Sequence, residues 1–156
     1  MSQISNINEQ AEAIVKLSAK ARKQIFIFSH ELEPTYYDQP EFISNCKGML
    51  LRHPQCHIRI LIQQNENLKK MNHRFLDLMH RLASRIELKL CHDDYKTHPE
   101  TFMLVDEQGI FLKRTPGRMP AIADFDNRRL NNEYQRFFNT VWDQSDFDTS
   151  LRQLSI

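Results

Sequence analysis

Two short apolar runs, each preceded by a helical segment, constrain the fold of this chain most strongly. They are residues 25–28 (IFIF) and residues 57–63 (HIRILIQ). A run that is apolar at consecutive positions is typical of a strand buried on both faces. The segments before them, residues 8–23 and 42–50, carry apolar side chains at helical spacing. This alternation predicts an α/β fold with a mixed, largely parallel sheet and helices on both faces.

The rest of the chain continues the alternation and then adds an antiparallel hairpin. We expect a helix over 67–84, a strand near a sheet edge over 86–91, the hairpin over 101–114, a loop over 117–127 and a helix over about 127–144. Gly109 can take the left-handed position in the hairpin turn. The 156 residues are the length of one domain, so a single domain over 1–156 is predicted.

Composition excludes several classes of protein. No segment approaches the roughly 20 apolar residues that cross a bilayer, and the first ten residues lack the features of a secretory signal. The three cysteines, at wide spacing, argue against a disulfide framework and for the cytoplasm. No CxxC, HExxH or glycine-rich phosphate loop is present, so no metal or cofactor is expected. A net charge of +1 does not indicate a strong nonspecific nucleic-acid binder.

The segment around the hairpin resembles H-x-K-x4-D, the motif of the phospholipase D superfamily, in which the histidine attacks phosphorus and the lysine binds phosphoryl oxygens. With Asp106 on the motif aspartate, the lysine and histidine positions fall on Thr101 and Pro99, which cannot do this chemistry. His98 is one residue out of register, and one residue turns a strand side chain to the opposite face. Its use as a nucleophile would need a bulge.

The wider chain resembles one phospholipase D-like half, and more closely an uncharacterised family of small bacterial proteins with a degenerate form of that domain. The matching features are Ser29, Leu32-Glu33-Pro34, Tyr37-Asp38, His73-Arg74, Asp106, Asp124-Phe125 and Trp142. Some members of that family are attached to acetyltransferase domains, but this chain has no acetyl-CoA loop and no acetyl transfer is implied. Because the superfamily's reaction needs two motifs, the resemblance implies a homodimer.

A polar segment, HELEPTYYDQPE, follows the first apolar run at residues 30–41. In α/β sheets, ligands bind beyond the carboxyl ends of the parallel strands, so this rim is a candidate site. His30, beside two glutamates, can act as a base or nucleophile, or it can pack on the rim and bond the backbone. Asp38 and Glu41 have the spacing of a capping box for the next helix. Tyr36 and Tyr37 either pack on the rim or stack on nucleic-acid bases.

Basic residues recur in several segments. The helix expected over 67–84 can restart at Asn72, which places His73 and Arg74 near a helix start, where a phosphate or carboxylate can bind. If the cations converge they form an anion site, and otherwise they cover a solvated face; they are Lys69, Lys70, Arg74, Lys113, Arg114, Arg118, Arg128 and Arg129. The candidate ligand-binding residues are Ser29, His30, Glu33, Tyr37, His73, Arg74, Asp106, Arg114 and Asp124.

Three functional hypotheses follow. The first is a non-catalytic phospholipase D-like domain that binds a phosphate-bearing or other anionic ligand, or a protein partner. The second is a metal-independent phosphodiesterase or nuclease that uses a relocated histidine, His30 or His98. The third is a nucleic-acid-binding module that combines the basic stretches with Tyr36 and Tyr37 as stacking platforms.

Overall fold

The computed structural model describes residues 2–70, 72–115, 120–148 and 150. Its helices are α1 (Ile7–Ala19), α2 (Pro34–Tyr37), α3 (Pro40–Arg52), α4 (Glu66–Lys70), α5 (Arg74–Arg81) and α6 (Arg128–Gln144), with a 3-10 turn η1 (Asp93–Tyr95). Its strands are β1 (Ser2–Ile4), β2 (Gln24–Ser29), β3 (His57–Ile62), β4 (Ile86–Leu90), β5 (Thr101–Val105), β6 (Gly109–Lys113), β7 (Ala121–Asp124) and β8 (Asp146–Phe147).

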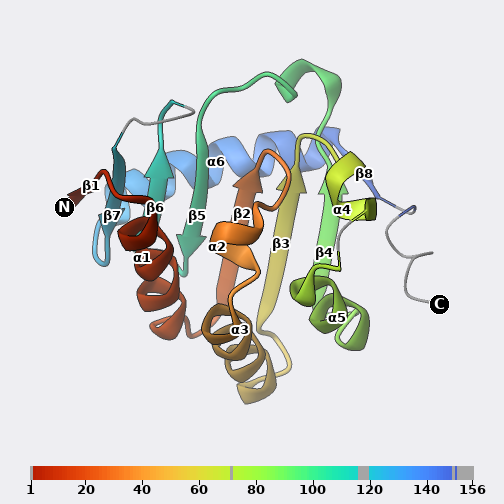
Figure 1. The fold of residues 1–156 in the computed structure, drawn as a ribbon, viewed down its shortest axis with the longest axis horizontal. Coiled ribbons are helices and arrows are strands. Elements are labelled where there is room, and N and C mark those ends of the chain that lie inside the picture. The colour runs from red at the N-terminus through yellow and green to blue at the C-terminus, as the bar shows by residue number, and fades with distance from the viewer. Residues whose placement is uncertain (1, 71, 116–119, 149, 151–156) are drawn as a thin grey trace.

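The strands of the described residues form one mixed sheet in the order β1-β7-β6-β5-β2-β3-β4-β8 (Figure 1). β2, β3 and β4 are parallel to each other, and every other pairing is antiparallel. The expected mixed α/β sheet with an added hairpin is therefore confirmed. Its parallel part is smaller than expected, because the short strands β1, β7 and β8 add further antiparallel pairs.

Helices cover both faces of the sheet, as expected. α6 lies behind the sheet in Figure 1, while α1, α2, α3 and α5 lie in front of it. Side chains alternate along β2: Ile25 and Ile27 join the core under α1, α3 and α5, whereas Phe26 and Phe28 join the core under α6. β2 is buried on both faces because each of its two sets of side chains has a helical layer to pack against.

Two local predictions were wrong, and a third holds in its alternative form. The helix expected over 67–84 is divided near Asn72, where a restart was considered: residues 72 and 73 are not helical, and His73 begins α5 as its N-cap. Met71 lies outside the described residues. The loop expected over 117–127 contains β7, which pairs with β6 and β1. In the hairpin turn, Asp106 and not Gly109 adopts the left-handed conformation, with φ of 55°.

Among the described residues, no helix is both long enough and apolar enough to cross a membrane. Cys46, Cys56 and Cys91 are all buried and free.

Candidate functional site

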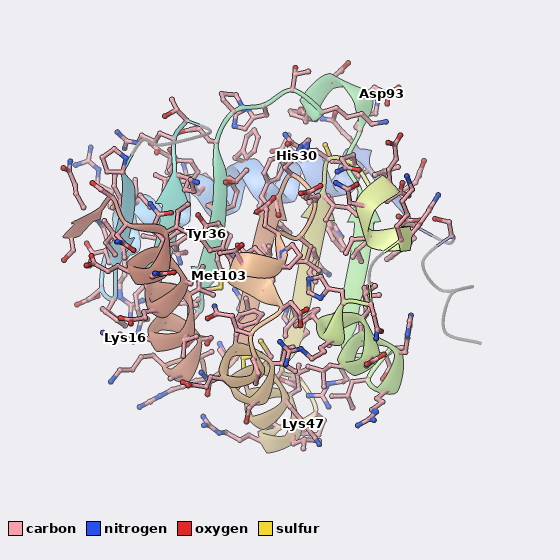
Figure 2. The ribbon with its side chains drawn as sticks, viewed as in Figure 1. Lys16, His30, Tyr36, Lys47, Asp93 and Met103 are labelled. Atoms are coloured by element: carbon pink, nitrogen blue, oxygen red, sulfur yellow. The ribbon has the colours of Figure 1, made fainter. Side chains whose placement is uncertain are left out.

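A cavity lies at the carboxyl edge of the sheet, where β2 and β3 end and β5 begins. The segment between β4 and β5 arches over this edge in Figure 1, and Figure 2 shows His30 there. The cavity has a volume of about 510 Å³. The side chains lining it include His30, Glu33, Tyr36, Gln63, Thr101 and Lys113. His30 and Glu33 were predicted to belong to a site at this edge, and the structure brings both into one cavity.

Gln63 fixes which nitrogen of His30 carries a proton. Its amide nitrogen donates to the carbonyl oxygens of Tyr95 (2.9 Å) and His98 (2.8 Å), so its Oε1 is left as an acceptor. This oxygen lies 3.2 Å from Nδ1 of His30, which must therefore be the donor. In the neutral imidazole, Nε2 of His30 then carries the free lone pair. The ring is exposed, so that nitrogen is accessible to a ligand or to water.

Ser29 and Glu33 shape the loop that follows β2. The buried Ser29 hydroxyl donates to the Glu33 carboxylate (3.0 Å to Oε1) and accepts from the backbone N–H of Leu32 (2.8 Å). Glu33 also accepts from the N–H of Glu31. Leu32 has a positive φ of 59°, a conformation that needs such support in a residue with a Cβ. Ser29 therefore acts mainly on the loop, while Glu33 both holds the loop and lines the cavity.

Lys113 supplies a cation to the cavity, although the list of candidate ligand-binding residues omitted it. Its Nζ donates to the hydroxyl of Tyr36 (3.2 Å) and lies 5.5 Å above the centre of that ring. The Tyr36 hydroxyl in turn donates to Oε1 of Gln10 (2.6 Å). Lys113 is paired across the hairpin with Thr101, the motif's lysine position. A lysine from the neighbouring strand thus reaches the region where the motif lysine is missing.

Arg114, which was predicted as a ligand, instead points toward the other face. It is exposed and acts electrostatically on Tyr134 of α6. Burial and a hydrogen bond to Glu100 (2.7 Å) raise the pKa of Tyr134 to about 12. Side chains alternate along a strand, and this alternation is the sequence signal that could have separated Lys113 from Arg114.

His98 lines the cavity with Pro99 and Thr101, but its ring is held by α6. It stacks on Phe137 at a centroid distance of 4.6 Å and meets the edge of Phe28 at 5.7 Å. Its Nε2 is buried without a hydrogen-bond partner among the described residues and lies 3.7 Å from the Glu100 carboxylate. The ring therefore packs against the aromatic core and is poorly placed for attack on a ligand.

Tyr37 and His73 support the rim from below and do not line the cavity. Tyr37 is buried between Tyr36 and Phe42, and burial raises its pKa well above the usual value. His73 accepts the N–H of Phe75 at Nδ1 and so donates from Nε2 to the carbonyl of Leu32 (3.0 Å). Burial lowers the pKa of His73. Tyr36 and Tyr37 are 6% and 3% exposed, so of the two alternatives they pack on the rim and do not offer stacking platforms for bases.

Asp38 and Arg74 pair with each other at the surface. Nε of Arg74 donates to Oδ1 of Asp38 (2.7 Å), and Nη2 donates to the Asp38 carbonyl (2.9 Å). The capping box expected at the start of α3 is wrong: Gln39 is the N-cap there and makes no side-chain cap bond. Asp38 instead accepts from the backbone N–H of Arg74 at the start of α5.

Asp106 and Asp124 lie at the opposite edge of the sheet. The Asp106 carboxylate accepts the backbone N–H groups of three consecutive residues, Arg22 (3.0 Å), Lys23 (2.8 Å) and Gln24 (3.1 Å). Asp124, at the end of β7, accepts from the N–H of Asp126 and the amide of Asn127. Their distance from the cavity follows from topology, because antiparallel β5 ends where parallel β2 begins.

The basic residues singled out in the sequence do not converge on one site. Lys113 lines the carboxyl-edge cavity together with Lys96, which is bonded to Asp93 (2.9 Å). Lys69 and Lys70 are exposed on α4, Arg128 and Arg129 lie near the opposite edge, and Arg118 falls outside the described residues. Within the described residues, no three His, Cys, Asp or Glu side chains are grouped so that they could hold a metal ion.

Known structures share this fold at low sequence identity. TrmBL2, an archaeal chromatin protein with a novel mode of DNA binding, matches with a TM-score of 0.66 and 11% identity over 93% of this chain and 53% of its own. This chain thus spans about half of TrmBL2. Nuc from Salmonella typhimurium, a phospholipase D family member, matches with a TM-score of 0.58 and 12% identity over 86% of this chain and 88% of its own. NucT from Helicobacter pylori matches with a TM-score of 0.61 and 12% identity over 94% of this chain and 98% of its own.

These matches show that the chain has a phospholipase D-like fold. No curated protein matches the sequence. A family model described as a domain of unknown function, DUF7931, matches residues 6–154. That segment includes α1, the whole carboxyl-edge cavity and the Asp106 turn. The chain therefore belongs to the DUF7931 family.

Proposed function

We propose that this chain is a non-catalytic phospholipase D-like domain that binds a phosphate-bearing or other anionic ligand in the carboxyl-edge cavity. The observation that carries the proposal is the position of Lys113. Its ammonium group lines a cavity whose motif histidine and lysine positions are occupied by Pro99 and Thr101. The cavity has a cation that can bind an anionic ligand, whereas the position of the motif histidine carries no nucleophile.

The lining also favours a ligand that is more than inorganic phosphate. Ile7, Pro99 and the ring of Tyr36 give the cavity apolar walls. Hydrogen-bonding groups come from Lys113 and His30, which can receive the charged end of a ligand. A phosphate ester with a small apolar or aromatic group matches both parts, since small-molecule sites are commonly apolar with a few placed polar groups.

Calorimetric titration with phenyl phosphate tests the proposal. We expect Lys113→Met to weaken binding about tenfold or more, since a charge-assisted hydrogen bond contributes roughly 1.5–3 kcal/mol. Lys47→Met is the matched control, because Lys47 is exposed on α3 at the opposite end of the molecule in Figure 2, and it should bind as the wild type does. Equal affinity of the two variants, or no binding by the wild type, would count against the proposal.

A metal-independent phosphodiesterase is the alternative, and the tautomer of His30 is the observation that favours it. A neutral imidazole with Nδ1 held by Gln63 and Nε2 free is equipped to act as a nucleophile or base. Hydrolysis of bis(p-nitrophenyl) phosphate, measured with and without divalent ions, separates the two functions. We expect no turnover. Turnover by the wild type that His30→Ala abolishes would replace our proposal with this alternative.

A homodimer and a cytoplasmic location complete the proposal. The dimer rests on the superfamily's use of two halves, and three buried free thiols support a reducing compartment. Light scattering coupled to gel filtration should give twice the chain mass of 18.6 kDa. A monomeric mass at high protein concentration would remove the dimer from the proposal and leave the ligand site in place.

A further inference from the structure

The amino edge of the sheet, opposite the proposed ligand cavity, carries a second cavity with a different lining. It has a volume of about 750 Å³ and lies between the ends of α1 and α3 and the start of α6. Its basic residues are Lys20, Arg22, Lys23, Arg52 and Arg128, and its acidic residues are Asp106 and Glu107. A chain with a net charge of only +1 has thus concentrated cations at one place.

The five basic and two acidic residues leave this lining with a net charge of +3. Asp106 directs its carboxylate to the backbone N–H groups of residues 22–24, as described above. Glu107 is paired with Arg128 at 3.3 Å. In the described part of the chain, Lys20, Arg22 and Lys23 form no ion pair within 4.0 Å and are exposed. Three ammonium or guanidinium groups therefore remain available to an anion.

The cavity continues into a third hollow along α6. The two share Glu107 and Arg128, and the third, about 600 Å³ in volume, adds Arg129 and Arg136 together with amide side chains such as Asn132 and Gln135. The shared wall is held in place by Asn131, whose amide donates to the carbonyls of Asp106 (3.3 Å) and Gly109 (2.8 Å). The result is an elongated basic surface that can follow a chain of phosphates.

Phe125 adds an exposed aromatic ring to this surface. It lines the basic cavity, and 46% of its surface is exposed. On its other side lies a cavity that contains Glu9, Glu12, Asp124 and Asp126. A polyanion that enters the basic cavity is therefore directed away from this acidic side and along α6.

We infer that this amino-edge surface, from Lys20 to Arg136 with Phe125 at its border, binds single-stranded nucleic acid. Cations spaced along a groove track the phosphates, an aromatic ring stacks on a base, and amide side chains hydrogen-bond base edges. A lipid surface fits less well, because the surface is a cavity and Phe125 is the only large exposed apolar side chain among the described residues that line it. The inference is independent of the proposed ligand cavity.

The test is fluorescence anisotropy of a labelled oligothymidylate of roughly 15 nucleotides, the scale of a single-strand site, measured across a salt series. We expect wild-type binding that weakens as salt rises. The double variant Lys20→Gln/Lys23→Gln should bind at least tenfold more weakly, with a salt slope about 1.4 smaller in magnitude, since each released phosphate contact contributes about 0.7. Lys69→Gln/Lys70→Gln makes the same change in net charge outside the surface and should bind like the wild type.

Phe125→Ala supplies a second, electrostatically neutral readout. Loss of one stacked base should weaken binding about tenfold and leave the salt slope unchanged. Lys113→Met should bind the oligonucleotide as the wild type does. The proposed ligand cavity and the amino-edge surface are therefore tested independently of each other. Wild-type protein that shows no salt-dependent binding would overturn the inference. Equal losses in the two lysine double variants would overturn it as well, because binding would then follow net charge alone.

Discussion

The positions that align with the phospholipase D motif lie at two opposite edges of the sheet, and they differ in what they contribute to the structure. At the amino edge, the Asp106 carboxylate accepts hydrogen bonds from three backbone N–H groups in the segment that joins α1 to β2, so this carboxylate stabilises the fold. At the carboxyl edge, Pro99 is exposed and Thr101 half-buried, and neither makes a side-chain hydrogen bond in the described part of the chain. One part of the motif is therefore needed for folding whether or not the domain is an enzyme, whereas the other part is needed only for chemistry.

This difference gives Asp106 a structural reason to be present. Replacing a side chain that satisfies several backbone donors leaves those donors unpaired, and that costs stability. Replacing a nucleophile or a phosphate-binding lysine costs activity alone. The backbone contacts of Asp106 account for this residue, and Lys113 on the next strand brings a cation to the carboxyl-edge cavity.

The largest effect is expected for Asp106→Ala. It removes three charge-assisted hydrogen bonds and places alanine at a positive φ, so we expect a loss of about 3 kcal/mol in the free energy of unfolding. Asp106→Asn keeps one carbonyl acceptor and a residue that tolerates this φ, and should lose about half as much. Urea denaturation measures both. If the two variants are as stable as the wild type, Asp106 is not the structural residue described here.

A smaller loss is expected for Ser29→Ala, which tests the corresponding loop at the carboxyl edge. The N–H of Leu32 loses its acceptor and Glu33 loses a donor, both in a mostly buried loop. We expect a loss of about 1–2 kcal/mol in unfolding free energy. Ser29→Cys, which keeps a weak donor and acceptor of similar size, is the matched variant and should lose less. A loss as large as that of Asp106→Ala would show that the two edges contribute equally to stability, contrary to the comparison above.

His73 should make stability depend on pH. Burial lowers its pKa in the folded state, so the unfolded chain binds a proton more readily. The contribution of neutral His73 to the free energy of unfolding is therefore fully present above the unfolded pKa of about 6.5. It is lost as pH falls through the lowered folded pKa, and the slope of this loss is no more than about 1.4 kcal/mol per pH unit. His73→Asn keeps a capping acceptor and should flatten the decline between neutral and mildly acidic pH. An unchanged decline would assign the pH dependence to other groups.

The smallest effect is expected for Arg74→Ala. Its side chain is 55% exposed, and exposed ion pairs contribute at most about 1 kcal/mol. We expect a loss of about 0.5 kcal/mol in unfolding free energy and unchanged binding of phenyl phosphate, since Arg74 does not line the cavity. Weaker binding of phenyl phosphate would show that Arg74 takes part in ligand binding.

The sequence predicted the parts of the fold that depend on long local patterns. β2, β3, the β5–β6 hairpin and α6 were all expected, because continuous apolar runs and helical spacing are properties of a single segment. The short strands β1, β7 and β8 were not expected. Each has two to four residues, and their strand conformation depends on partners elsewhere in the chain.

The candidate site was predicted at the edge where the cavity lies, but with a different set of residues. The rule that ligands bind at carboxyl ends pointed to His30 and Glu33, and the structure places both in that cavity. Which of Lys113 and Arg114 faces the cavity depends on where the strand register begins, and the burial of Tyr36 and Tyr37 depends on how α2 packs. Strand alternation separates Lys113 from Arg114 once the register is known, but the register and the packing of α2 are set by tertiary contacts that a single sequence does not show.

NMR titration of the amide-labelled wild-type protein with phenyl phosphate decides whether the carboxyl-edge cavity binds the ligand, because it locates the ligand. We expect chemical-shift changes concentrated at His30, the side-chain amide of Gln63, and Lys113, with none at the Asp106 turn. The same titration of Lys113→Met should show these changes reduced. Changes that centre on the amino edge, or that are identical in the wild type and in Lys113→Met, would show that the ligand does not bind in this cavity through Lys113.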